Sequence, residues 1–505
     1  MKKKITTLFI GLLVAASSCK DMNISPSDAL DTNTLIGTAD GLSNALNGTY
    51  ALFKDHIEFN GLVDQNNMYL RQFYHLSDFA SDDIVCGQVT TDALYYSFSL
   101  GHSPGQTNTR YFWYISYKMI TGLNTVISAV EKSSATDAKT QQLLGECYFL
   151  RAFIHFNLVR IFGKPYSVDP NAPGIILRTN LTDDAKKARA TVAEVYDAVI
   201  ADAEKGASLM TQPRGVSYAS KEAAWALLSR VNLYKEDNQK AIDYANLVIN
   251  SGKFTLETAA SYPSLFANAQ TGKETIFCVA FTPVDDYGKF GSIASMIYSD
   301  GNSGWGEEYA SSSLRSVMSK HPEDVRWSYI VPSKDGTGTV QKRNGLEIYY
   351  ISKFSFQGGL PNLSSPIMFR LSEMYLNRAE AEAKMNNTSA ALDDVDIIRK
   401  NRGLEASLYN RALPSGYNTL DAVLEEKRIE MAFEGHRTYD VFRNKRKLSK
   451  AYWGYHLQGL KETDIDLSRT PSGYPNMVID YTNPRVIYYI PIDETLSNPL
   501  ATQNQ

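Results

Sequence analysis

EKRIEMAFEGHRTYDVFR, residues 426–443, is the segment from which the architecture of this chain is best predicted. On a helix, Glu426 and Glu430 lie on the same face. This density of carboxylates and arginines beside a histidine could serve acid–base chemistry. It also fits a buried ion-pair network that closes a helix end, with Gly435 as the C-cap, and we favour this structural interpretation because buried charges need compensation. The partners expected in the network are Arg437, Asp440 and Arg443.

Helical periodicity dominates the chain on the N-terminal side of this stretch. Apolar residues recur every three to four positions, Thr191 and Glu194 form a capping box, and Gly163 and Pro165 give a stop signal. The segment 56–108 is expected to be irregular, and strands are expected at 275–281 and 347–354, with a short extended element at 488–492. The expected helices are 39–53, 110–130, 138–162, 191–203, 220–233, 238–252, 366–385, 389–401 and 419–433.

Two stretches of the chain echo one another. Residues 235–249 read KEDNQKAIDYANLVI and residues 384–398 read KMNNTSAALDDVDII, and each gives a polar turn followed by an apolar helix. Helix–turn–helix units with small residues at the crossing are typical of TPR-like repeats. We therefore predict a mainly α fold, in which TPR-like helical hairpins at 34–253 and 366–435 pack against a loop-rich subdomain with small β elements. That subdomain is an insertion at 254–365, and a loop-rich tail follows at 436–505.

The N-terminus has the layout of an export signal. Three lysines precede an apolar run from Ile5 to Ala16, which is too short to span a bilayer, and two serines lead to Cys19. This resembles a bacterial lipoprotein signal, although Ala16 stands where leucine is commonest. We predict a signal peptide at 1–18, acyl chains such as palmitate on Cys19, and a flexible tether at 19–33. The alternative is an ordinary secretory signal followed by a chance cysteine.

Composition narrows the function further. The net charge is −4 and no block of Lys and Arg follows the signal, so nucleic acid is not an expected partner. Cys86, Cys147 and Cys278 are far apart, which indicates neither a disulfide framework nor a metal site. The 31 tyrosines fit recognition surfaces for amphipathic ligands such as sugars, because their rings combine an apolar face with a polar edge.

The stretch 426–443 resembles the C-terminal signature of the SusD/RagB family of outer-membrane nutrient-uptake lipoproteins. ECYFLRAFIHFNLVRIFGKP (146–165), RLSEMYLNRAEAEAK (370–384), IRKNRG (398–403) and IPIDETLSNP (490–499) resemble other family segments in the expected order. The resemblance implies four TPR-like hairpins, lipid anchoring on the cell surface at the outer membrane, and no catalytic residues. It also implies a SusC-like TonB-dependent barrel as partner, with the membrane contacted only through the lipid anchor.

The candidate ligand residues follow from the chemistry of glycan recognition, which needs exposed Trp or Tyr rings beside polar side chains. Trp305 stands between two glycines in SGWGEE, and the same segment holds Tyr298, Tyr309 and Asn302. The alternative for this cluster is packing of the insertion. A second cluster consists of Tyr95, Tyr96, His102 and Asp82, whereas Trp113 lies on a periodic helix face and is expected in the core.

We therefore expect a surface lipoprotein that captures an oligosaccharide and passes it to the barrel. No cofactor is predicted; Ca²⁺ on Asp285 and Asp286 is left open, and no EF-hand loop is visible. One alternative is a peptide-capturing protein of the RagB kind. Another is a surface glycosidase, which would need two carboxylates roughly 5–10 Å apart in a cleft.

Overall fold

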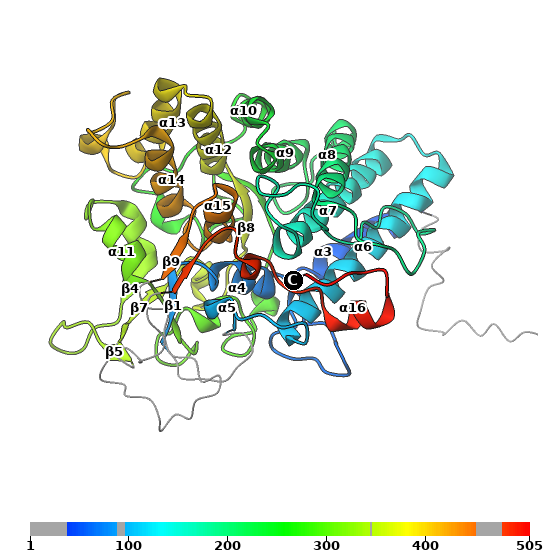
Figure 1. Ribbon diagram of the computed structural model, residues 1–505, viewed down its shortest axis with the longest axis horizontal. Coiled ribbons are helices and arrows are strands. Elements are labelled where there is room, and N and C mark those ends of the chain that lie inside the picture. Colours follow the sequence, from blue (N-terminus) through cyan, green and yellow to red (C-terminus); the bar gives the residue numbers. More distant parts are fainter. Residues whose placement is uncertain (1–37, 88–95, 344–345, 451–476, 505) are drawn as a thin grey trace, which may run out of the picture.

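The larger part of the protein is a row of helices, seen in a computed structural model that describes residues 38–87, 96–343, 346–450 and 477–504 (Figure 1). Each helix packs on its neighbour, from α6 through α7, α8, α9, α10 and α12 to α13 and α14, and α3 packs on α6 and α7. This is the mainly α architecture that the sequence predicts. The helices are α3 (Ala39–Ala51), α4 (Tyr69–Asp78), α5 (Tyr96–Ser99), α6 (Thr107–Ser133), α7 (Ala138–Phe162), α8 (Val192–Leu209), α9 (Lys221–Lys235), α10 (Asn238–Ile249), α11 (Ser312–Met318), α12 (Leu371–Lys384), α13 (Thr388–Lys400), α14 (Thr419–Glu430), α15 (Arg437–Arg443) and α16 (Ile492–Ser497).

Helix starts follow the capping residues in the sequence. The Asp137 side chain accepts a hydrogen bond from Thr140 N at the start of α7, and Ser220 accepts one from Ala223 N at the start of α9. Thr191 and Glu194 form both hydrogen bonds of the predicted capping box. Each cap supplies an acceptor to a backbone N–H that has no partner inside its helix. The predicted helix over 138–162 has the same bounds as α7.

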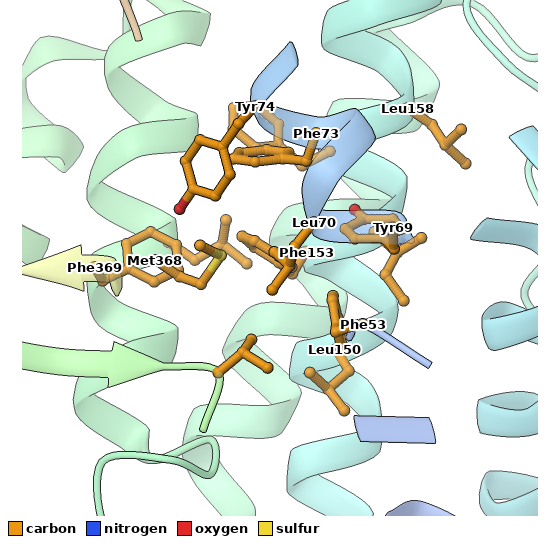
Figure 2. Close-up of a cluster of buried hydrophobic side chains, with 14 of the residues drawn as sticks. Phe53, Tyr69, Leu70, Phe73, Tyr74, Leu150, Phe153, Leu158, Met368 and Phe369 are labelled. Carbon is orange, nitrogen blue, oxygen red and sulfur yellow. The ribbon is translucent and has the colours of Figure 1, made fainter. Parts of the chain in front are cut away.

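The core centres on α7, which is buried on almost every side. In Figure 2 its Leu150, Phe153 and Leu158 lie among aromatic side chains of α4 and of strand β8 (Ile367–Arg370). The Phe153 ring centroid is 5.8 Å from that of Phe369 and 6.2 Å from that of Phe53. Segments far apart in the sequence therefore meet at α7 in one core.

Two sequence-based expectations are wrong in this core. The segment 56–108 is not irregular throughout, because it contains α4, α5 and strand β1 (Ile84–Cys86). All ten residues of α4 are buried, including Arg71 and Asp78 on its polar face. The predicted helix over 366–385 begins instead with β8, and α12 follows directly.

The remaining strands form short antiparallel pairs. The pairs in the described residues are β1–β3, β2–β8, β4–β7, β5–β6 and β9–β10. Strands form within both segments where the sequence predicts them, 275–281 and 347–354. Most of the strands lie within the insertion. The bounds are β2 (Thr275–Cys278), β3 (Glu308–Ala310), β4 (Ile330–Pro332), β5 (Lys342–Arg343), β6 (Leu346–Glu347), β7 (Tyr349–Ile351), β9 (Leu448–Lys450) and β10 (Met477–Ile479).

Two strand pairs join the insertion to the helices. β2 pairs with β8, which runs into α12, and β1 pairs with β3 in the register Val85↔Tyr309. Within the described ranges, no helix is long and apolar enough to cross a bilayer. The predicted signal peptide, Cys19 and the tether lie outside those ranges.

Helices α7 and α8 approach closely at two glycines. A Cβ atom added to Gly206 would lie 2.8 Å from the carbonyl oxygen of Gly145, and one added to Gly145 would lie 2.9 Å from the carbonyl oxygen of Gly206. Both obstacles are backbone atoms, which cannot rotate away as a flexible side chain can. The crossing therefore requires glycine at both positions.

Replacing Gly206 with alanine is expected to lower the free energy of unfolding by about 1–2 kcal/mol, because overpacking at the crossing outweighs the gain in helix propensity. The matched control is Gly48→Ala in α3, where an added Cβ would meet nothing within 4 Å. That change is expected to raise stability by about 0.5–1 kcal/mol. Urea denaturation of the two variants checks the opposite signs, and equal effects would contradict the close crossing.

Candidate ligand-binding site

The polar residues of 426–443 lie in a buried ionic network. Glu430 accepts hydrogen bonds from Arg402 at 2.8 and 3.0 Å and is also paired with Arg370 and Arg326. Burial favours the protonated carboxyl, yet Arg402 and Arg370 hold the pKa of Glu430 well below its usual range. The structural interpretation of this stretch is therefore confirmed. The other members are Glu274, Asp324, Lys353, Arg399, Glu426 and Glu434.

The prediction that Gly435 is a helix C-cap is wrong. Helix α14 ends at Glu430 with Met431 as its C-cap, so Gly435 is not the C-cap. Its φ of +75° lies in the left-handed region, and its N–H donates to the Asp78 carboxylate at 3.0 Å. Gly435 therefore docks the loop after α14 onto α4.

Asp82 is not available to a ligand, which corrects its prediction as a sugar contact. Its carboxylate accepts hydrogen bonds from Arg437 at 2.7 and 3.0 Å and lies 3.3 Å from Arg428. The residue is 6% exposed, and these two guanidinium groups compensate its charge. Asp440 and Arg443 are paired with each other, as the sequence predicts, and Arg443 also contacts Glu380.

Trp305 stands at the edge of an aromatic cluster on the insertion. The residue is half-buried, the Phe290 ring contacts it edge-on at 5.6 Å, and the Lys289 ammonium lies 3.8 Å from its ring centroid. A Cβ on Gly304 would meet the Tyr298 carbonyl oxygen at 2.0 Å, and one on Gly306 would meet Tyr350 at 2.7 Å. The flanking glycines therefore allow a tight fold of the chain beneath the ring.

The other residues of this cluster separate into exposed and buried ones. Asn302 is exposed and lies three residues before Trp305 in the chain, whereas Tyr298 is 9% exposed and Tyr309 is fully buried. Tyr309 cannot present a ring face in this structure, because strand β3 places it against β1 and Gly87. Tyr298 packs edge-on against Phe356 and Tyr350.

Two exposed phenylalanines were not predicted for this surface. Phe290 is 64% exposed and Phe356 is 42% exposed. A search for Trp and Tyr with polar neighbours passes over Phe, and Phe356 joins the cluster only through the tertiary fold. We call Phe290, Trp305, Asn302 and Phe356 the Trp305 surface.

The second predicted cluster does not form one site with Asp82. His102 packs against Tyr488 with ring centroids 3.5 Å apart, and burial lowers the pKa of His102 to about 3. Tyr96 is half-buried in α5, and Tyr95 lies outside the described residues. The ligand roles of Tyr95, Tyr96 and His102 stay predictions.

The two aspartates considered for Ca²⁺ have partners within the chain. Asp285 accepts a hydrogen bond from Lys54 at 2.7 Å and from the Thr282 backbone, and Asp286 accepts one from Gly288 N. In the part of the chain that the structure describes, no group of three or more His, Cys, Asp or Glu could hold a metal ion.

Comparison with known proteins covers nearly the whole chain. Residues 48–233 match a family described as "Starch-binding associating with outer membrane", and residues 295–505 match one described as "SusD family". SusD-like protein P2 of Formosa agariphila is 26% identical over 490 residues, which cover 88% of this chain and 91% of that protein.

Solved structures show the same architecture. A SusD superfamily protein from Bacteroides thetaiotaomicron aligns with a TM-score of 0.78 and 27% identity, covering 93% of this chain and 100% of that one. A SusD-like carbohydrate binding protein from Bacteroides vulgatus has a TM-score of 0.73 and 20% identity, with 92% and 97% covered. The helical row and its insertion are therefore a recurrent fold.

Proposed function

Because the chain belongs to the SusD/RagB family, we propose that it is a cell-surface lipoprotein that captures an oligosaccharide and delivers it to a SusC-like TonB-dependent outer-membrane barrel. The description of the family matched at 48–233, which names starch binding and the outer membrane, supports both the ligand class and the location. The layout of residues 1–19 supports an anchor at Cys19. The protein then acts by binding, without a chemical step of its own.

The Trp305 surface is the observation that carries this proposal. Aromatic faces pack against the C–H faces of sugars, and Asn302 beside them can donate to and accept from hydroxyl groups. The Lys289 ammonium over the Trp305 ring supplies three more donors at the same place. Exposed aromatic rings beside neutral and cationic donors are the combination that a polyhydroxylated ligand needs.

Replacing Trp305 with alanine is expected to weaken binding of the recognised glycan by about thirtyfold or more, because a central aromatic anchor is typically worth at least about 2 kcal/mol. Titration calorimetry against a panel of soluble polysaccharides and peptides measures the loss. The matched control is Trp225→Ala in α9, where Lys221 also lies over a half-buried indole ring, at 5.3 Å from the centroid.

Each outcome of this titration bears on the function. Glycan binding lost in the Trp305 variant and kept in the Trp225 variant supports capture at the Trp305 surface. Glycan binding equal in all three proteins would move the site elsewhere. Binding of peptides without any glycan would replace the proposal with the peptide-capturing alternative.

A further inference from the structure

A groove follows the outer face of α6, away from the Trp305 surface. Its hollow is about 780 Å³ and lies between α6, the turn at 58–60 and α16. Figure 1 shows α6 and α16 to the right of β4 and β7. The residues that line the groove are different residues from those of the Trp305 surface.

Four aromatic side chains line the groove. Phe59, Tyr114 and Tyr117 are half-buried, and Trp113 forms part of the floor at 5% exposure. The Phe59 and Tyr114 ring centroids are 5.2 Å apart, and those of Trp113 and Tyr117 are 4.9 Å apart. Positions 110, 113, 114, 117, 118 and 121 repeat every three to four residues, so they share one face of α6.

The polar groups of the groove are held in place by other protein groups. Arg110 forms a bidentate pair with Asp493, with N–O distances of 2.6 and 2.7 Å. The Trp113 indole donates to Glu494 at 3.1 Å, and Asn498 donates to the other oxygen of the same carboxylate at 2.9 Å. A ligand would therefore meet fixed acceptors and donors and would order few side chains on binding.

The charge of the groove is nearly balanced. Two cations, Arg110 and Lys118, line it together with the carboxylates of Glu58, Asp493 and Glu494. The excess is a single negative charge, which is too little to select a strongly anionic or cationic ligand. A neutral ligand with many hydroxyl groups finds both donors and acceptors.

The groove continues beyond Tyr117. A second hollow of about 270 Å³ shares Tyr117, Thr121 and Glu494 with it and is lined further by Asn180 and Arg178. The stretch of α6 from Arg110 to Thr121 alone is about 17 Å long at the helical rise. This length accommodates several linked sugar units of an extended chain.

We propose that the α6 groove, defined by Phe59, Arg110, Tyr114, Tyr117 and Asp493, is a second carbohydrate-binding site for an extended segment of a neutral glycan. This site would act together with the capture site proposed at the Trp305 surface. A long glycan chain held at two places dissociates more slowly than one held at either place alone. An extended peptide is disfavoured, since no strand edge lies among the residues that line the groove.

The test compares Tyr114→Ala, Trp305→Ala and the double variant of the full chain. Alanine suits the middle of α6, and Tyr417→Ala is the control, because Tyr417 is an exposed tyrosine (45%) outside both sites. The probes are xyloglucan, galactomannan, amylopectin and mixed-linkage β-glucan, measured by affinity electrophoresis. Hydrogen–deuterium exchange of residues 56–62 and 491–497 gives a second readout at the groove itself.

The expected result is about tenfold weaker binding of one polysaccharide by the Tyr114 variant, a further loss in the double variant, and slower exchange of both segments when the polysaccharide is present. If the Tyr114 variant loses binding and the Trp305 variant binds normally, the result supports the groove as a glycan site and rules out the Trp305 surface. Unchanged binding in the Tyr114 variant and unchanged exchange would overturn the groove while leaving the proposed function in place.

Two other outcomes also overturn the groove as a glycan site. Failure of the unaltered protein to bind any of the four polysaccharides, or their acid-hydrolysed oligosaccharides, would remove both the groove and the proposed glycan capture. Normal glycan binding by the Tyr114 variant, together with loss of co-purification with an outer-membrane barrel, would identify the groove as a protein-docking surface.

Discussion

Replacing Glu430 with glutamine is expected to lower the free energy of unfolding by about 3–5 kcal/mol. Glu430 is fully buried, and its carboxylate is shared by Arg326, Arg370 and Arg402. Glutamine keeps the shape but removes the negative charge, so three buried guanidinium groups lose a common counter-ion. Removing one partner from a buried ion pair costs far more than the pair contributes in net stability, because the remaining charge is not solvated.

The matched control for this change lies on the same helix. Glu425 is paired with Lys320 at 2.7 Å, and both side chains are partly exposed, at 27% and 43%. Glu425→Gln is therefore expected to cost at most about 1 kcal/mol, since water screens such a pair. Urea denaturation at pH 7.5 measures both variants, and similar losses for the two would show that burial of the network contributes little.

The protein is also expected to lose roughly 3–5 kcal/mol of stability between pH 6.5 and pH 4.5. Burial is the main cause that lowers the pKa of four imidazoles, those of His75, His102, His155 and His436, and it takes the pKa of His102 and of His155 to about 3. These groups stay neutral in the native state but bind protons in the unfolded state below about pH 6.5. The stability they contribute is therefore present above pH 6.5 and is lost as the pH falls.

Buried aspartates act in the opposite direction, and Asp78 shows the strongest shift among them. Burial raises the pKa of Asp78 well above its usual range, although Gly435 N–H donates to it. Native Asp78 therefore binds its proton at higher pH than the unfolded chain does, which stabilises the native state as the pH falls. The four imidazoles outweigh Asp78 and the smaller shifts of the other aspartates, so we expect a net uptake of about two protons on unfolding, at about 1.4 kcal/mol per proton and pH unit.

Two variants separate these contributions by sign. The slope of the free energy of unfolding against pH reports how many protons are taken up on unfolding. His155→Gln is expected to lower this number by about one, and Asp78→Asn is expected to raise it by about one. Asparagine keeps an oxygen that can accept the Gly435 N–H. Urea denaturation at pH 7.5, 6.5, 5.5 and 4.5 gives the slopes, and a stability that stays constant across this range would contradict the buried neutral imidazoles.

The sequence-based predictions succeed where a local pattern reports which side of a helix meets the core. Helix α7 and the caps at Thr191 and Ser220 agree with the structure because the caps and the stop at Gly163 are encoded by neighbouring residues. Helix α4 was missed because its start carries no such signal. Its N-cap residue, Met68, makes no side-chain cap hydrogen bond.

The candidate site was less predictable than the fold. Trp305 and Asn302 could be chosen from residue chemistry and flanking glycines, and the structure places both at the surface. Asp82 was chosen on the same grounds, but its carboxylate is held by Arg437 and Arg428 from the other end of the chain. A carboxylate that binds sugar and one that binds arginine look alike in sequence, because their partners are not local.

Local sequence patterns predict the row of helices and the family, since periodicity, caps and motifs are properties of neighbouring residues. Contacts between distant segments determine which aromatic rings remain exposed and which charges are already compensated. The pairing of β1 with β3 buries Tyr309. The approach of α16 to α6 creates a groove from residues whose patterns in the sequence do not connect them. Both outcomes depend on contacts between distant segments, which no local pattern records.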